Sequence, residues 1–167
     1  MNKIPHIGMR TVKTALAVFA SLVIGWLMQG QSDPLCIAVA AIVALQPSRQ
    51  DTQQAGINRL IGTAAGGMWG IVIFLANIFV LGSLHQIVQF ALIAAGIVVV
   101  ILTGLGIKRP DSVGIACVVY LIITTAPVGE LNPLKYMAIR LLDTFIGFAV
   151  AMALNSFRLP QENDGQP

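Results

Sequence analysis

The chain has 167 residues, of which 56% are hydrophobic and 10% are charged, and its formal net charge is +3. A soluble domain carries about 25% charged residues, so this composition excludes an ordinary soluble domain and predicts one small all-α membrane domain in contact with lipid. The basic residues form no stripe interleaved with aromatic residues, which argues against a nucleic-acid partner.

The first predicted span covers residues 11–30. Lys3, Arg10 and Lys13 precede its uncharged run, which extends from Thr14 to Ser32. It is long enough to cross a hydrocarbon core of about 30 Å. A cleaved signal peptide would have similar charge and hydropathy. However, no small-residue cleavage pattern follows Met28, and more apolar runs come later, so we expect the segment to remain in the protein.

The second predicted span, residues 34–48, is unusually short. Asp33 and Pro34 start it and Pro47 breaks it, so its apolar part, residues 35–45, reaches only about 16 Å at about 1.5 Å per residue. Two interpretations remain open. A short proline-bounded segment can mark a binding site, as in transporters, or it can be an ordinary short span that its neighbours bury.

The third predicted span, residues 58–80, contains the strongest packing signal. Asp51 and Gln54 have the form of a capping box, which predicts that this helix begins in water at Asp51. Glycines then recur at every fourth residue, with one further glycine beside them, and form a doubled G-x-x-x-G surface: Gly62, Gly66, Gly70 and Gly67. A second helix backbone can lie close to such a surface, either within the chain or from another subunit.

Three further spans are predicted at residues 86–105, 112–127 and 134–157. The fifth ends at a helix-breaking proline, Pro127. Asn132 and Pro133 have the pattern of a cap and a first helical residue, so they predict the start of the sixth span. The six spans form one membrane domain, residues 1–157, and residues 158–167 are predicted to be a disordered cytoplasmic tail.

Other candidate functional residues have simpler interpretations. His85 lies at the mouth of the fourth span, where a lone histidine is expected to be solvated. Cys36 and Cys117 lie in apolar segments without C-x-x-C spacing and are interpreted as small buried hydrophobic residues. The sequence contains no nucleophile–base pair and no metal-ligand cluster. We therefore predict no catalytic residues, no metal site, no cofactor and no enzyme activity.

The motif R-L-x-x-T-x-x-G occurs twice, at residues 59–66 and again at residues 140–147. In a helix the Arg, Thr and Gly of this motif lie on one face, and the Gly permits close approach of a neighbour. Each copy opens a long apolar segment and follows a short segment that ends at a proline. The pattern predicts two repeats of three helices each.

The positive charges predict six spans with both termini in the cytoplasm. In this arrangement Lys135 lies outside with Arg140 near the outer rim, and the other cations lie inside: Lys3, Arg10, Lys13, Arg49, Arg59, Lys108, Arg109 and Arg158. If residues 35–45 did not cross, this positive-inside bias would vanish. Because each repeat has three spans, the two copies are expected to have opposite orientations, which is the inverted-repeat architecture of many secondary transporters.

Three stretches carry a family resemblance: Gly8–Ala17, Ala44–Ser48 and Asn58–Gly67. Together they resemble the aromatic acid exporter family, which belongs with the fusaric acid resistance proteins. The resemblance extends over residues 8–155, and R-x-x-G-T-x-x-G-G is its most specific part. It implies efflux of aromatic carboxylates through the inner, cytoplasmic membrane by six-span units that work in pairs. Larger members add a second membrane unit or a soluble domain, so we expect this single unit to form a homodimer or a larger homo-oligomer.

The leading hypothesis is an efflux component for small organic anions. Arg140 and Arg59 would attract the substrate carboxylate, and Thr63 and Thr144 would offer hydroxyl groups on the same helix faces. The alternative is a membrane scaffold or partner subunit without a substrate. In that case the glycine surface and Gly147 would only pack helices or join subunits.

Arg140 and Asp143 are the charges that lie deepest within a predicted span, and they share one face of the sixth helix. A charged residue at the centre of a membrane helix costs about 2.5–3.5 kcal/mol on insertion scales, so Asp143 is expected to face protein or a wet cavity. Two interpretations remain open. Arg140 can extend to the outer headgroups and merely neutralise Asp143. Alternatively, the pair lines the exit path, where Arg140 binds the carboxylate and Asp143 weakens that grip or carries a coupling proton.

The charge distribution gives a testable topology. A reporter that is active only outside the cytoplasm should be active when fused after Ser83 and inactive when fused after Lys108 or Pro167, because only the first position follows an odd number of spans. Activity after Pro167 would contradict six spans and, with them, the inverted repeat.

Overall fold

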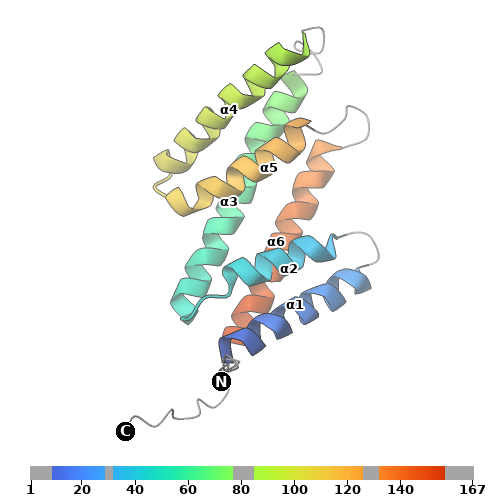
Figure 1. Cartoon of the computed structure of the whole chain (residues 1–167), viewed down its shortest axis with the longest axis vertical. Coiled ribbons are helices and arrows are strands. Elements are labelled where there is room, and N and C mark those ends of the chain that lie inside the picture. Colours follow the sequence, from blue (N-terminus) through green and yellow to red (C-terminus); the bar gives the residue numbers. More distant parts are fainter. Residues whose placement is uncertain (1–8, 29–31, 77–84, 126–131, 157–167) are drawn as a thin grey trace, which may run out of the picture. The chain divides into compact units, whose positions relative to one another are not determined.

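The structure is a computed structural model that describes residues 9–28, 32–76, 85–125 and 132–156. All regular secondary structure in these residues is helical, which confirms the predicted all-α class. The helices are α1 (Met9–Leu27), α2 (Pro34–Ala44), α3 (Arg49–Ala76), α4 (Gln86–Gly106), α5 (Val113–Thr125) and α6 (Pro133–Ser156), and a short 3-10 helix, η2 (Pro110–Ser112), leads into α5 (Figure 1). The predicted break at Pro127 and the predicted tail at residues 158–167 lie outside the described residues.

The starts of α2 and α6 follow the sequence pattern. Asp33 Oδ1 accepts a hydrogen bond from the backbone N–H of Leu35 at 3.0 Å, and Asn132 Oδ1 accepts one from the N–H of Lys135 at 3.2 Å. In each case proline is the first helical residue, where its missing N–H costs nothing. A side-chain cap and a proline therefore define both helix starts. The cap at Asn132 was predicted, whereas for Asp33 and Pro34 only the start of the segment was predicted.

The start of α3 differs from the prediction. Ser48, and not Asp51, caps the helix: the backbone N–H of Asp51 donates to Ser48 Oγ at 3.0 Å, and the Ser48 hydroxyl donates to the Asp51 carboxylate at 2.6 Å. The helix therefore begins at Arg49, and Asp51 is its third residue. Pro47 lies in the break between α2 and α3, as predicted.

The chain forms two compact units. Unit 1 comprises Met1–Gly56 and Phe145–Pro167, and unit 2 comprises Ile57–Thr144. Unit 1 holds the adjacent helices α1 and α2 with the first part of α3 and the last part of α6. Unit 2 holds the adjacent helices α4 and α5 with the remainder of α3 and the first part of α6. Each unit therefore has the same set of parts.

In unit 1 the core is made of small residues that let helices approach closely. The buried residues are Ala17, Ala41, Ala44, Leu45 and Ala151, with Phe148, Val150 and Leu154 packed against them. A Cβ atom on Gly147 of α6 would lie 2.5 Å from the Ile37 carbonyl oxygen and 2.5 Å from the Ala40 Cβ of α2. Only glycine allows this contact between α6 and α2.

In unit 2 the predicted glycine surface faces α5. A Cβ atom on Gly66 would overlap the backbone carbonyl of Ala116, and one on Gly62 would lie 2.5 Å from the Ser112 carbonyl oxygen. Gly70 lies against the Ile123 side chain. The structure therefore answers the open question about this surface: it is a contact within the chain.

Gly67, the extra glycine of the pattern, has a different partner. A Cβ atom there would lie 2.8 Å from the Met137 side chain of α6. Unit 2 also contains two hydrophobic clusters, which are built mainly from larger apolar side chains. They consist of Ile93, Val100, Ala116 and Tyr120 in one cluster, and Phe74, Val119 and Ile123 in the other.

The two copies of the repeated motif pack in the same way. Gly66 of the first copy lies on α5, the middle helix of the second repeat, and Gly147 of the second copy lies on α2, the middle helix of the first repeat. Two repeats related by a two-fold axis would likewise place the glycine of each repeat on the middle helix of the other. This packing supports the inverted repeat, which remains a proposal.

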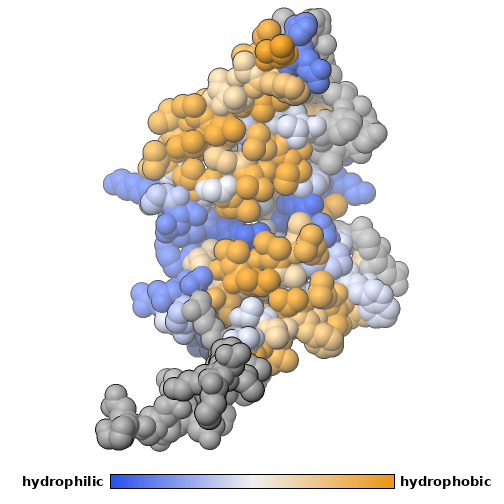
Figure 2. All heavy atoms as spheres, in the orientation of Figure 1, coloured by the Kyte–Doolittle hydropathy of each residue, from blue (hydrophilic) through white to orange (hydrophobic). Residues whose placement is uncertain are grey.

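Three helices, α3, α4 and α6, are long and apolar enough to cross a membrane, whereas the apolar parts of α1, α2 and α5 are shorter over the described residues. Many large apolar side chains are exposed, such as Trp26 at 75% and Ile87 at 70%. Figure 2 shows hydrophobic residues over much of the visible helix surface. This surface suits lipid. Crossing by the three shorter helices stays a prediction.

The contact between α3 and α5 can be tested with two alanine substitutions. Gly66→Ala should lower the free energy of unfolding by about 1–3 kcal/mol, because the new methyl group would overlap the Ala116 backbone. Gly114→Ala is the control, since nothing lies within 4 Å of a Cβ atom there, and it should be neutral or stabilise the protein by up to about 1 kcal/mol. Unfolding in detergent measures both, and equal effects would contradict this packing.

Candidate functional site

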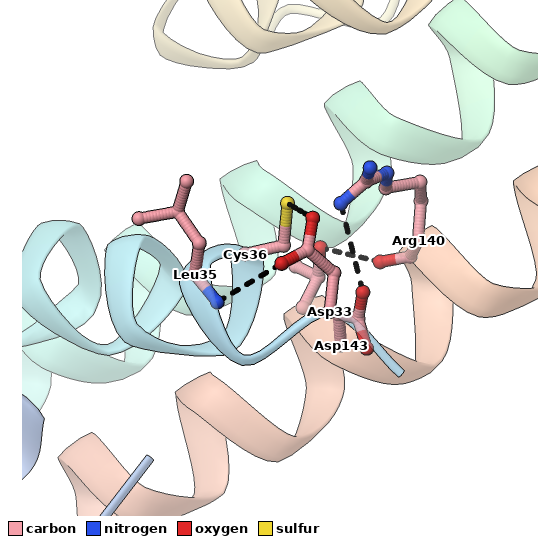
Figure 3. Close-up of polar contacts among 6 residues, drawn as sticks. Asp33, Leu35, Cys36, Arg140 and Asp143 are labelled. Atoms are coloured by element: carbon pink, nitrogen blue, oxygen red, sulfur yellow. Dashed lines mark hydrogen bonds and ion pairs between the residues drawn. The ribbon is translucent and has the colours of Figure 1, made fainter. Parts of the chain in front are cut away.

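The most buried carboxylate of the described chain is on α6, next to an arginine. Arg140 Nη1 lies 3.7 Å from Asp143 Oδ2, and the two side chains are 20% and 1% exposed (Figure 3). The residues share a helix face at i and i+3, as the sequence predicts. A charge-assisted hydrogen bond is usually about 2.7–2.9 Å long, so this contact is an ion pair and not a short hydrogen bond.

The Tyr136 ring is a second neighbour of the Arg140 guanidinium group. The guanidinium carbon of Arg140 lies 4.6 Å from the centroid of the Tyr136 ring, within the range of a cation–π interaction. Tyr136 was not predicted as a site residue, although its spacing of four residues before Arg140 places both on one face of a helix. This spacing could have identified Tyr136 as a neighbour of Arg140 from the sequence.

The Tyr136 ring and hydroxyl have different environments. The ring packs against the cluster of Phe74, Val119 and Ile123. The hydroxyl oxygen is buried and has no hydrogen-bond partner among the residues that the structure describes. A buried hydroxyl without a partner is uncommon in native proteins.

Thr63 and Thr144 are buried, and both use their hydroxyl proton on the backbone. Thr63 Oγ1 donates to the Arg59 carbonyl at 2.9 Å, and Thr144 Oγ1 donates to the Arg140 carbonyl at 2.7 Å. In this conformation each hydroxyl can offer only lone pairs, which do not attract an anion. A carboxylate-binding role for the two threonines stays a prediction that requires these bonds to open.

Arg59 lies in unit 2 with Arg140, and its surroundings are locally similar. It is half-buried, and the Nε atoms of both arginines are buried. Each arginine carries the backbone carbonyl that receives the threonine hydroxyl one turn later. The two copies of the motif therefore share a buried arginine Nε and the hydrogen bond from the threonine hydroxyl to the arginine carbonyl.

Asn58, beside Arg59, makes side-chain hydrogen bonds to Arg109 and Asp111 that were not predicted from the sequence, and we call these three residues the polar clamp. Its Oδ1 accepts from Arg109 Nη1 at 2.9 Å, and its Nδ2 donates to Asp111 Oδ2 at 3.3 Å. The clamp holds the connection between α4 and α5 on α3. Lys108, at φ 59°, makes the left-handed turn that starts this connection.

A second polar cluster lies in unit 1 and holds the break at Pro47. Asn155 Nδ2 donates to Thr52 Oγ1 at 2.9 Å and to the Gln46 carbonyl at 3.2 Å. The Thr52 hydroxyl also donates to the Ser48 carbonyl at 2.9 Å, and the Thr52 side chain is fully buried. These contacts satisfy backbone groups that the break leaves open, so their role is structural.

The remaining candidates have minor roles. Cys36 is half-buried, and its thiol donates to Asp33 Oδ2 at 3.3 Å (Figure 3). Cys36 is therefore a polar partner of the α2 cap, and its interpretation as a purely apolar residue was wrong. Cys117 is also half-buried. His85 is exposed at the start of α4, in agreement with a solvated histidine.

Comparison with known proteins identifies a family. The family model described as aromatic acid exporter family member 1 matches residues 5–158. UPF0421 protein OB2406 of Oceanobacillus iheyensis is 29% identical over 160 residues, which are 93% of this chain and 41% of that protein. The chain thus spans about two fifths of the length of this relative. No solved structure matches significantly.

These matches confirm the resemblance found in the sequence. Together with the three long apolar helices, they indicate a membrane protein.

The ion pair on α6 predicts a specific pattern of stability. Arg140→Ala should lower the free energy of unfolding by about 3 kcal/mol, because it leaves the Asp143 carboxylate buried without its arginine. Lys135→Ala removes an exposed cation from the same helix and should change it by less than about 0.5 kcal/mol. The double variant Arg140→Ala/Asp143→Ala should recover most of the loss. Additive losses in a double-mutant cycle in detergent would contradict the pairing.

Proposed function

Since this chain belongs to the aromatic acid exporter family, we propose that it is an efflux component for small aromatic carboxylates in the cytoplasmic membrane. The observation that carries the proposal is the environment of Arg140. Its guanidinium group is only 20% exposed, lies over a tyrosine ring and is paired with a buried carboxylate. Such an environment is costly in a membrane helix, and intramembrane charges commonly mark a transport path.

Arg140 would bind the substrate through its planar guanidinium group. A guanidinium can hold a carboxylate with two parallel hydrogen bonds, which a lysine cannot do. Asp143 would hold the arginine when no substrate is present and compete with the substrate when it is bound. This competition keeps binding weak enough for release, as export requires. In an alternative form of the same proposal, Asp143 would carry a coupling proton.

The proposed topology has six spans, two inverted repeats and cytoplasmic termini. The positive-inside bias of the sequence and the reciprocal packing of Gly66 and Gly147 support it. In this topology Arg59 opens its helix at the cytoplasmic face and Arg140 opens its helix at the outer face. Arg59 would then attract the anion on entry, and Arg140 would bind it before exit.

We also propose that the chain works as a homodimer or larger homo-oligomer, because the family resemblance implies paired six-span units. The scaffold alternative depended on the glycine surface as a subunit contact. Gly62, Gly66 and Gly70 lie against α5 of the same chain, so that surface is already occupied. Self-association would need another surface, and no observation favours the scaffold.

The function can be tested with a conservative substitution. Arg140→Lys keeps the charge and should preserve the protein level, but it should abolish most of the tolerance to aromatic carboxylates, because the planar fork is lost. Arg49→Lys, which makes the same change at an exposed position, is the control and should behave as the wild type.

The measurement is growth of a deletion strain, complemented by each variant, on panels of aromatic carboxylates, aliphatic carboxylates and neutral aromatic compounds. A deletion strain with normal tolerance to every panel would contradict the proposed efflux. Normal tolerance with Arg140→Lys, in a background where deletion lowers it, would place the substrate site elsewhere.

A further inference from the structure

The Tyr136 hydroxyl makes no hydrogen bond to the part of the chain that the structure describes. The oxygen is buried and has no hydrogen-bond partner in the described part of the chain, whereas Tyr120, the other tyrosine, donates to the Ile93 carbonyl at 2.9 Å. Phenylalanine at position 136 would keep both the apolar packing and the ring under Arg140. The hydroxyl itself adds nothing to either contact.

An unsatisfied buried hydroxyl destabilises a protein, because it loses its hydrogen bonds to water and gains none in return. The cost disappears when a ligand supplies an acceptor. The position of the hydroxyl indicates which ligand: it belongs to a ring whose centroid lies 4.6 Å from the Arg140 guanidinium carbon. An acceptor that reaches this arginine is an anion, and a phenol is a good donor to an anion.

We propose that Tyr136 is a substrate-binding residue whose hydroxyl donates a hydrogen bond to the carboxylate that Arg140 binds. This inference rests on the proposed function. It adds a neutral donor to the charged one, and the two donors together favour an acid over its ester or amide. Asp143 is paired with the guanidinium group, whereas the Tyr136 hydroxyl donates to neither Asp143 nor any other described residue, so it is a donor that Asp143 does not occupy.

The test compares Tyr136→Phe with Tyr120→Phe in the full chain, purified in detergent, by thermal unfolding with increasing benzoate and, as a neutral probe, methyl benzoate. Without ligand, Tyr136→Phe should unfold at the wild-type temperature or above it, whereas Tyr120→Phe should unfold at a lower temperature because the Ile93 carbonyl loses its donor. With benzoate, Tyr136→Phe should need about tenfold more ligand for half of the stabilisation, the loss expected for one hydrogen bond to a charged group. Methyl benzoate should stabilise none of the proteins.

The outcomes separate this inference from the function on which it rests. If benzoate stabilises the wild type, and Arg140→Lys weakens this effect but Tyr136→Phe does not, the proposed site stands and the role of Tyr136 is overturned. If Tyr136→Phe without ligand loses as much stability as Tyr120→Phe, the hydroxyl is structural and the inference also fails. If neither benzoate nor other aromatic carboxylates stabilise the wild type, the proposed function and the inference fail together.

Discussion

The close contact of two helix backbones at each copy of the repeated motif determines most of the structure. Glycine at the last position of R-L-x-x-T-x-x-G fixes which face of α3 meets α5 and which face of α6 meets α2. Arginine and threonine lie on that same face, seven and three residues earlier, so the packing also sets their orientation. The burial of Thr63 and Thr144 follows from this register. The candidate site residues are thus placed by the helix contact that each glycine makes.

A face that is packed so tightly restricts how charge can be accommodated on it. Asp143 precedes Gly147 by one turn, and its side chain is 1% exposed. A buried carboxylate is costly unless it is paired, and Arg140 supplies a cation 3.7 Å from it. The arginine in turn lies over the Tyr136 ring, which limits its rotamers. Three residues within about two turns of α6 therefore contact one another, and the packing of the Tyr136 ring on Phe74, Val119 and Ile123 helps to fix their positions.

The sequence predicted the features that depend on neighbouring residues. The cap at Asn132 and the shared face of Arg140 and Asp143 need only helix geometry, and both were found. The α3 start was misplaced because two overlapping cap patterns occur there, and the contact between Ser48 and Asp51 decides between them. Features that depend on tertiary packing were not predictable: no local pattern names α5 as the partner of the glycine surface or fixes the rotamer that places an arginine over a ring.

The difference between the two copies matters as much as their similarity. Where the second copy has Asp143, three residues after its arginine, the first copy has Gly62. A Cβ atom at Gly62 would lie 2.5 Å from the Ser112 carbonyl oxygen, so the first copy has no room for a carboxylate at this position. Arg59 therefore lacks the competitor at i+3 that Arg140 has. The two arginines therefore differ in the residue one turn later, which is a glycine packed on α5 in the first copy and a buried carboxylate in the second. Under the proposed topology, Asp143 would compete with the anion for Arg140 near the outer face and would speed the release of the anion there.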